Sequence, residues 1–271
     1  MKPKAIHIVG YGINCEEETA FAFEKAGAES KFVHINDLIE KKNLLDEAQI
    51  LVFPGGFSYG DDTGSGKALA NKIRNRLSEE ILKFVEKDKL VVGICNGFQV
   101  LVSLGLLPAT NKNYGKKEVG LLYNTNARFE CRWIRLKMNS KKCIFTQGID
   151  EIDIPIAHGE GNFYASKEIL KKINQNDQVV FKYIKENGQL ANGEFPYNPN
   201  GSLEDIAGIC DETGRILGMM PHPERAIFTL NHPDYQFMKE KLIREGKKIP
   251  EIYEPALKVF QNAVSYFKVK V

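Results

Sequence analysis

Three features are scarce or missing in this sequence, and each narrows what the chain can be. Its charges nearly cancel, with 37 Lys and Arg against 35 Asp and Glu, whereas a nucleic-acid-binding chain needs a basic excess or stripe. No apolar run approaches the roughly 18 residues of a membrane span. The first ten residues, MKPKAIHIVG, turn polar too soon for a secretory signal peptide. We therefore expect a cytoplasmic protein that binds neither nucleic acid nor membrane.

The cysteines are also uninformative as a framework. There are five of them, an odd number, and they are scattered without any CxxC spacing. Neither a disulfide scaffold nor a zinc site is therefore predicted. For four of them (Cys15, Cys131, Cys143 and Cys210) we expect the role of a small buried hydrophobic residue.

Strand-like and helix-like segments alternate through the first half of the chain. Ile50–Phe53 and Leu90–Ile94 are short runs of apolar residues, and Ala68–Lys87 carries apolar residues at spacings of three and four. Asn14 precedes three glutamates, which predicts a helix that Asn14 caps. Strands that are apolar on both faces are typical of a parallel sheet covered on each side. We predict an α/β fold with an open, mostly parallel sheet and helices on both faces.

The second half of the chain has a different texture. Asn, Gly and Pro turns separate segments such as Ala127–Met138 and Val179–Ile184, which indicates added hairpins. Glu254–Lys268 predicts a helix with Pro255 at its first position and an apolar stripe that packs on the main domain. The length allows one large domain or two small ones. The simplest interpretation is a single domain over 1–271, with a core of about 4–228 and a C-terminal helical extension of about 229–271.

Two glycine-rich segments resemble nucleotide-binding loops, but each fails at a required position. The third glycine after Gly10-Tyr11-Gly12 would fall on Cys15. In Gly60–Lys67 the spacing is wrong by one residue, and Ala68 stands where a magnesium-binding Ser or Thr belongs. We therefore predict no cofactor and no metal in this chain.

The pentapeptide Gly93-Ile94-Cys95-Asn96-Gly97 carries the strongest sign of chemistry. It follows the apolar strand Leu90–Ile94 and opens a helix expected over Phe98–Leu104. This strand–turn–helix context is that of a nucleophile elbow with cysteine in place of serine. The flanking glycines suit a tight turn, and a helix N-terminus favours a thiolate. Cys95 is the predicted nucleophile, and the alternative is a core cysteine in a tight turn.

His222 is the predicted base for this nucleophile. In Pro221-His222-Pro223-Glu224, an extended backbone would project His222 and Glu224 to the same side. Glu224 would then orient the imidazole as the third member of a triad. The serious alternative is His158, in the sequence His158-Gly159-Glu160-Gly161.

Attack on a carbonyl also needs N–H donors for the developing oxyanion. The elbow supplies one in the backbone amide of Asn96, and the loop after Ile50–Phe53 is a second source. Both loops leave the carboxyl edge of a parallel sheet, where they can converge. We predict an oxyanion and substrate-binding group that consists of Gly55, Gly56, Phe57, Asn96 and Gln99.

The order of these motifs, PGG, then G-x-C-x-G, then H-x-E, resembles the class I (triad) glutamine amidotransferases, which have a flavodoxin-like fold. Longer segments are similar to the glutaminase components of phosphoribosylformylglycinamidine synthases. These segments are PGGFSYGDD at Pro54–Asp62, GICNGFQVL at Gly93–Leu101, RFECRW at Arg128–Trp133, HGEGNF at His158–Phe163, NPNGS at Asn198–Ser202 and MMPHPERA at Met219–Ala226. The resemblance spans roughly residues 4–228, and the region after about residue 231 has no counterpart in these enzymes that we can match.

The resemblance implies a division of labour. This chain would hydrolyse L-glutamine through a γ-glutamyl thioester on Cys95, with His222 as the proton carrier and Glu224 as its orienting group. ATP, magnesium and formylglycinamide ribonucleotide would bind a separate synthetase subunit, which receives the ammonia directly, and multi-chain versions add a small third subunit. Arg128, Arg132 and the His158–Phe163 loop are expected on substrate-side or partner-side surfaces. The alternatives are a stand-alone γ-glutamyl hydrolase and a non-catalytic regulatory subunit.

Overall fold

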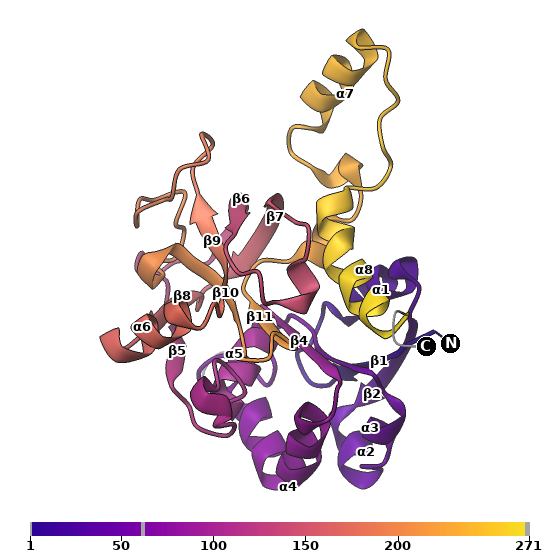
Figure 1. Ribbon diagram of the computed structural model, residues 1–271, viewed down its shortest axis with the longest axis vertical. Coiled ribbons are helices and arrows are strands. Elements are labelled where there is room, and N and C mark those ends of the chain that lie inside the picture. The colour runs from indigo at the N-terminus through magenta and orange to yellow at the C-terminus, as the bar shows by residue number, and fades with distance from the viewer. Residues whose placement is uncertain (1, 61–62, 269–271) are drawn as a thin grey trace.

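A nine-stranded sheet forms the centre of the molecule. The computed structural model describes residues 2–60 and 63–268, so the last two residues of the PGGFSYGDD segment lie outside it. The strand order is β2-β1-β3-β4-β11-β10-β9-β6-β7 (Figure 1). The bounds of these strands are β1 (Lys4–Val9), β2 (Glu29–His34), β3 (Ile50–Phe53), β4 (Leu90–Ile94), β6 (Glu130–Met138), β7 (Glu151–His158), β9 (Val179–Ile184), β10 (Ile206–Cys210) and β11 (Ile216–Met219).

The sheet has a parallel half and an antiparallel half. The strands β2, β1, β3, β4 and β11 are mutually parallel. Beyond β11, the strands β10, β9, β6 and β7 pair antiparallel, as expected for hairpins added after Ala127. A separate two-stranded ribbon pairs β5 (Val119–Leu122) with β8 (Asn162–Ala165). The prediction of an α/β fold with a mostly parallel sheet is confirmed, and the parallel half carries the candidate site.

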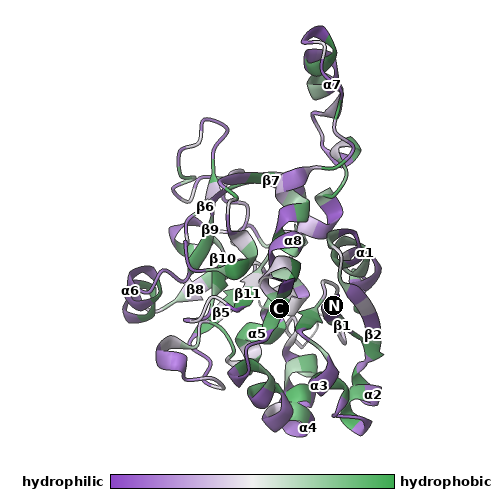
Figure 2. Cartoon of the chain, turned by 45° about the vertical axis from the view of Figure 1, so that its right-hand side comes forward, coloured by the Kyte–Doolittle hydropathy of each residue, from purple (hydrophilic) through white to green (hydrophobic). Residues whose placement is uncertain are grey.

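Helices cover both faces of the parallel half (Figure 1). On one face α1 packs against α8, and on the other α4 packs against α5, which also lies on β3 and β4. Figure 2 shows the apolar residues gathered in the strands and inner helix faces. The helices are α1 (Glu16–Ala26), α2 (Ile35–Glu40), α3 (Leu44–Glu47), α4 (Lys67–Glu86), α5 (Asn96–Leu104), α6 (Lys167–Gln175), α7 (Tyr235–Arg244) and α8 (Glu254–Lys268).

The prediction for the start of α1 was wrong by one residue. The N-cap is Cys15, not Asn14, and its side chain makes no capping bond to the helix. The reason is that Asn14 is held elsewhere, since its backbone N–H donates to the carbonyl of Gly55 and its Oδ1 accepts from the Cys15 thiol at 3.2 Å. Asn14 therefore belongs to a segment that pairs with the loop after β3.

The C-terminal helix α8 is part of the core. Its apolar stripe includes Leu257, Phe260 and Val264, all buried, and the ring of Phe260 packs edge-on against Phe23 of α1 with centroids 5.0 Å apart. The predicted bounds Glu254–Lys268 are confirmed. Burial of side chains of this size contributes about 1.5–3 kcal/mol each.

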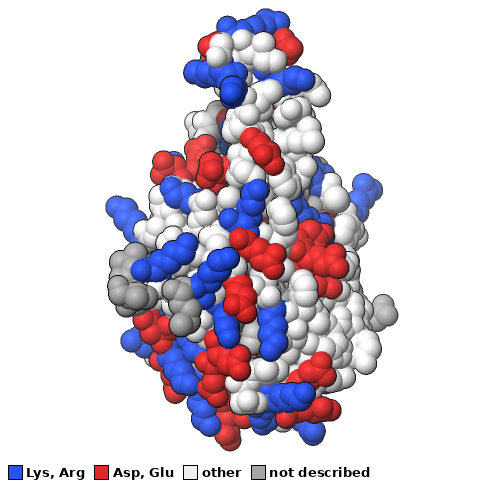
Figure 3. Space-filling view, turned by 90° about the vertical axis from the view of Figure 1, so that its right-hand side faces the viewer, with Lys and Arg blue, Asp and Glu red and all other residues white. Residues whose placement is uncertain are grey.

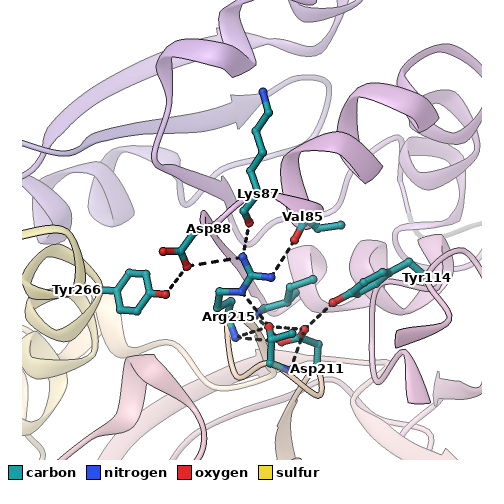
Figure 4. Close-up of polar contacts among 9 residues, drawn as sticks. Val85, Lys87, Asp88, Tyr114, Asp211, Arg215 and Tyr266 are labelled. Atoms are coloured by element: carbon teal, nitrogen blue, oxygen red, sulfur yellow. Dashed lines mark hydrogen bonds and ion pairs between the residues drawn. The ribbon is translucent and has the colours of Figure 1, made fainter. Parts of the chain in front are cut away.

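A polar network ties the far end of α8 to the sheet (Figure 4). The Tyr266 hydroxyl bonds Asp88 after α4, and Asp88 pairs with the guanidinium of Arg215. That guanidinium also donates to two carbonyls at the end of α4, which satisfies a helix C-terminus.

The buried carboxylate of Asp211 accepts from Tyr114 and from several backbone amides of its own turn. Burial and then the Asp211 charge raise the pKa of the Tyr114 hydroxyl well above its ordinary range.

Between β11 and α8 the chain forms an arm that carries α7. This helix projects from the body in Figures 1 and 2, and Figure 3 shows basic side chains gathered at its tip. None of its residues is buried, and Phe237 is 72% exposed. Within 2–60 and 63–268, no helix combines the length and apolar character that a bilayer crossing requires.

Candidate active site

The sheet topology explains how residues far apart in the sequence meet. β4 and β11 are parallel neighbours with Ile94 opposite Met219, so both strands end at the same edge. The backbone N–H of Cys95 donates to the carbonyl of Met219 at 2.8 Å. Three residues past Met219 the chain reaches His222. The structure therefore brings the predicted nucleophile and the predicted base to one place.

Cys95 occupies a strained turn between β4 and α5. Its φ of 52° is unusual for a residue with a side chain, which is the geometry of a nucleophile elbow. A Cβ on Gly97 would lie 1.8 Å from the carbonyl oxygen of Phe53, and one on Gly93 would lie 2.6 Å from that of Gly97. Both positions therefore require glycine. The Cys95 side chain is buried at the N-terminus of α5, and its thiol points toward the carbonyl of Ala157 at 3.7 Å.

His222 and Glu224 form a tightly bonded pair. The Nδ1 atom of His222 lies 2.6 Å from Oε1 of Glu224, and both side chains are buried. The expected extended backbone holds only up to His222, because Pro223–Ala226 forms a short 3₁₀ helix that folds the carboxylate back onto the ring. Burial alone would lower the pKa of His222, but the carboxylate of Glu224 and then the sulfur of Cys95 raise it well above its ordinary value.

This arrangement fixes which ring nitrogen can act. Nδ1 is occupied by Glu224, so Nε2, which has no hydrogen-bond partner among the described residues, is left for the sulfur and a substrate. The raised pKa favours an imidazolium, whose Nε2–H can serve as a proton donor beside the Cys95 sulfur. The site can therefore present a nucleophile and a proton donor together.

The predicted oxyanion loop is held by the segment before α1. The Phe57 amide donates to the Gly12 carbonyl at 2.6 Å, so it is not available to a substrate in this structure. Gly56 lies opposite Ile13 in an antiparallel bridge. The hydrogen bonds of this bridge are made by the residues on either side of the pair, from Asn14 N–H to the Gly55 carbonyl and from Phe57 N–H to the Gly12 carbonyl. The Gly56 amide therefore points away from that segment. With the amide of Asn96, the first residue of α5, it forms the remaining candidate pair of donors.

Asn96 and Gln99 serve the site through their side chains. Oδ1 of Asn96 accepts from the Ser58 amide at 3.3 Å, which links the elbow to the loop after β3. Its Nδ2 donates to Gln99 Oε1 at 3.0 Å, and Gln99 Nε2 donates to the Glu160 carbonyl at 2.7 Å. The Gln99 amide is thus engaged within the protein and supports the wall of the site.

A narrow cavity opens onto the sulfur. Its volume is about 10 Å³, which is space for one water molecule. The residues around it are Gly56, Phe57, Ser65, Cys95, Gln99, Ala157, His158, Gly159 and Glu160. Substrate entry therefore requires the surrounding loops to move. A larger cavity of about 310 Å³ lies outside the β6 and β9 strands and contains none of the triad residues.

His158, the alternative base, lines the narrow cavity beside Cys95, but no carboxylate is bonded to its ring. Its Nδ1 lies 3.2 Å from the amide oxygen of Asn124. Burial, and then the nearby His222, lower the pKa of His158 to about 3, so its ring is neutral. The ring is suited to lining the pocket rather than to carrying the proton. Of the predicted arginines, Arg128 is exposed and Arg132 bonds Glu130 at 2.8 Å.

Sequence reasoning missed two residues that touch the triad. Cys15 was expected to be an ordinary buried residue, and Arg225 was given no role. The structure places the Cys15 sulfur beside His222 and 2.9 Å from Nη2 of Arg225. The only signal was the adjacency of Arg225 to Glu224, because the approach of Cys15 depends on how the 12–15 segment folds against the loop after β3.

Residues 2–267 match the model of the CobB/CobQ-like glutamine amidotransferase domain, and the chain belongs to this family. The match continues past residue 231, so the expectation that this region has no counterpart in the family was wrong. Its relatives include phosphoribosylformylglycinamidine synthase subunit PurQ of Methanococcus maripaludis, which is 53% identical over 98% of this chain and 97% of the relative. The same subunit of Dehalococcoides mccartyi is 47% identical over 98% of each chain. A chain in the structure of PurLQS from Thermotoga maritima superposes with a TM-score of 0.72 and 33% identity, over 98% of this chain and all of that one.

Proposed function

We propose that this chain is the glutamine-hydrolysing subunit of phosphoribosylformylglycinamidine synthase. The observation that carries the proposal is the bonded His222–Glu224 pair beside Cys95 at a nucleophile elbow. The family and the full-length relatives named PurQ support it. The subunit acts in purine synthesis, where formylglycinamide ribonucleotide becomes formylglycinamidine ribonucleotide.

The first half-reaction makes a thioester. The Cys95 thiolate attacks the side-chain carbonyl carbon of L-glutamine, and the resulting oxyanion is stabilised by the amides of Gly56 and Asn96. When the tetrahedral intermediate collapses, the C–N bond breaks, and protonated Nε2 of His222 gives its proton to the departing ammonia. Each oxyanion donor of this kind is worth about 2.7–4 kcal/mol of transition-state stabilisation.

The second half-reaction releases glutamate. Nε2 of His222, now neutral, takes a proton from water as the oxygen attacks the thioester carbonyl. The same two amides bind the second oxyanion. Collapse breaks the C–S bond, and glutamate leaves while Cys95 again becomes the thiolate beside the imidazolium. Glu224 keeps the ring in one tautomer throughout.

The ammonia is used by a partner. A synthetase subunit, with a small third subunit in multi-chain versions, would bind ATP, magnesium and the ribonucleotide. No cofactor is assigned to this chain, in which both nucleotide-loop patterns fail at a required residue. We place the complex in the cytoplasm, and the free state of all five cysteines supports a reducing compartment.

The test compares glutamine with ammonia as nitrogen donor. In the complex, Cys95→Ser should abolish glutamine-dependent synthesis and leave ammonia-dependent synthesis largely intact. The isolated chain should hydrolyse glutamine slowly and accelerate when the synthetase and its ligands are added. Full activity of the isolated chain without any partner would favour a stand-alone γ-glutamyl hydrolase instead.

A further inference from the structure

Cys15 connects the oxyanion loop to the histidine. The Cys15 and Asn14 amides both donate to the Gly55 carbonyl at 3.2 Å. A Cβ placed on Gly55 would lie 2.8 Å from Cε1 of His222 and 3.1 Å from the Cys15 sulfur. The sulfur and the edge of the imidazole therefore meet across one α-carbon of this loop. Cys15 is completely buried, so this contact is shielded from solvent.

Arg225 holds the Cys15 sulfur from the other side. Its Nη2 donates to Sγ at 2.9 Å. Burial alone would lower the pKa of Arg225, but the Cys15 sulfur, and then the carboxylate of Glu224 and the sulfur of Cys95, raise it. The guanidinium is therefore a permanent positive charge close to two members of the triad.

The surroundings of Arg225 are partly open. A surface cavity of about 570 Å³ reaches both Arg225 and Glu224 between α1 and the segment after β11. The charged and titratable groups that face the guanidinium are Cys15, Glu17 and Glu18 at the start of α1, His222 and Glu224 on its own segment, and Cys95 on the elbow. Solvent can thus approach the guanidinium without passing through the substrate cavity.

We propose that Arg225 and Cys15 are positioning residues of the glutaminase. Together they hold His222 against the loop that bears the Gly56 amide, and the Arg225 guanidinium keeps a fixed positive charge close to the triad. The inference rests on the proposed function. Neither residue is the nucleophile or the proton carrier of the proposed mechanism. Cys15 fixes the Gly55 carbonyl through its backbone, and Arg225 fixes the Cys15 side chain against the imidazole. A displacement of 1 Å in such a site costs on the order of 100-fold in rate.

A metal ion is a poorer explanation of this cluster. Cys15, His222 and Glu224 offer one ligand atom each, all within 4.8 Å of one another. However, Oε1 of Glu224 is already bonded to Nδ1, and the sulfur already accepts from a guanidinium. A cation bound here would face the charge of Arg225 at close range.

The experiment measures glutamine hydrolysis by the complex with its synthetase, as kcat, KM and their pH dependence. Arg225→Met removes the charge, Arg225→Lys keeps it, Cys15→Ala removes the sulfur, and Cys15→Ser keeps an acceptor. The matched control is Cys131→Ala on β6, a cysteine that is exposed, so the prediction that it is buried was wrong. Millimolar guanidinium chloride is added to Arg225→Met, because the open cavity admits it beside Glu224.

We expect Arg225→Met and Cys15→Ala to lower kcat by about 10- to 100-fold with little change in the KM for glutamine. Loss of a nearby cation disfavours every deprotonated form, so Arg225→Met should move both limbs of the pH profile to higher pH. Arg225→Lys should leave the limbs in place, Cys15→Ser should retain more activity than Cys15→Ala, and guanidinium should restore part of the activity of Arg225→Met.

Two results would overturn the inference while the proposed function stands: an active Arg225→Met enzyme with wild-type kcat and pH limbs, or a uniform loss of rate with unmoved limbs and no response to guanidinium. The second result would mark Arg225 as merely structural. A wild-type complex that hydrolyses no glutamine would overturn the proposed function and this inference together. The wild-type arm therefore separates the two failures.

Discussion

Glu224→Gln is the substitution whose effect follows most directly from the structure. It leaves an amide of nearly the same shape against Nδ1 of His222, where the carboxylate oxygen now lies at 2.6 Å. What it removes is the negative charge that raises the pKa of the buried imidazole. Opposite charges about 4 Å apart at an effective dielectric constant of about 20 attract by about 4 kcal/mol.

That energy corresponds to about a thousandfold in rate at about 1.4 kcal/mol for each factor of ten. The glutamine amide can still bond the ring, so we expect kcat to fall by about 10²–10³. The pKa of His222 should also fall, because less negative charge supports the imidazolium. The alkaline limb of the rate profile should therefore move to lower pH.

The assay is glutamine hydrolysis by the complex from pH 5 to 10, with ammonia-dependent synthesis measured in parallel. Glu186→Gln, at an exposed position, is the matched control. Ammonia-dependent synthesis should be unchanged in both variants. Wild-type kcat and an unmoved alkaline limb in Glu224→Gln would refute the assignment of Glu224 as the orienting group.

Three further predictions concern the scaffold. Gly97→Ala should destabilise the fold by about 3 kcal/mol or more, because its Cβ would overlap the Phe53 carbonyl, and a melting temperature equal to wild type would contradict the elbow geometry. Phe260→Ala should cost about 3–5 kcal/mol in denaturant unfolding, whereas Phe237→Ala on the exposed arm should cost less than about 0.5 kcal/mol; equal effects would show that α8 is not core. Burial lowers the pKa of His7 to about 3, so folding disfavours its charged form. Its contribution to stability is present above pH 6.5 and is lost as the pH falls toward 3, and His7→Gln should flatten the acid side of a melting-temperature profile.

The parallel half of the fold was predictable because its signals are local. β3 and β4 are short runs without a polar residue, and their predicted bounds agree with the structure. The elbow follows from the same strand and the two glycines around Cys95. Pro255 and the apolar spacing after it likewise predicted the bounds of α8.

The rest depends on contacts between distant segments. The 12–15 segment pairs with the loop after β3. In this pairing the Phe57 amide points to Gly12, and the N-cap of α1 is Cys15 where the sequence predicted Asn14. No residue string reveals such a pairing. The conformation of Pro223–Ala226 was likewise not predicted. The sequence indicated an extended chain, whereas a single turn of 3₁₀ helix brings Glu224 onto the imidazole ring of His222.

The central claim is that one sulfur, that of Cys95, is the nucleophile. The most direct measurement treats the complex with a glutamine-mimicking diazoketone and locates the label by peptide mass spectrometry. We predict one label per chain, on Cys95, formed faster when the synthetase ligands are present and competed by glutamine. Labelling of Cys15, or equal labelling of the Cys95→Ser variant, would contradict the account.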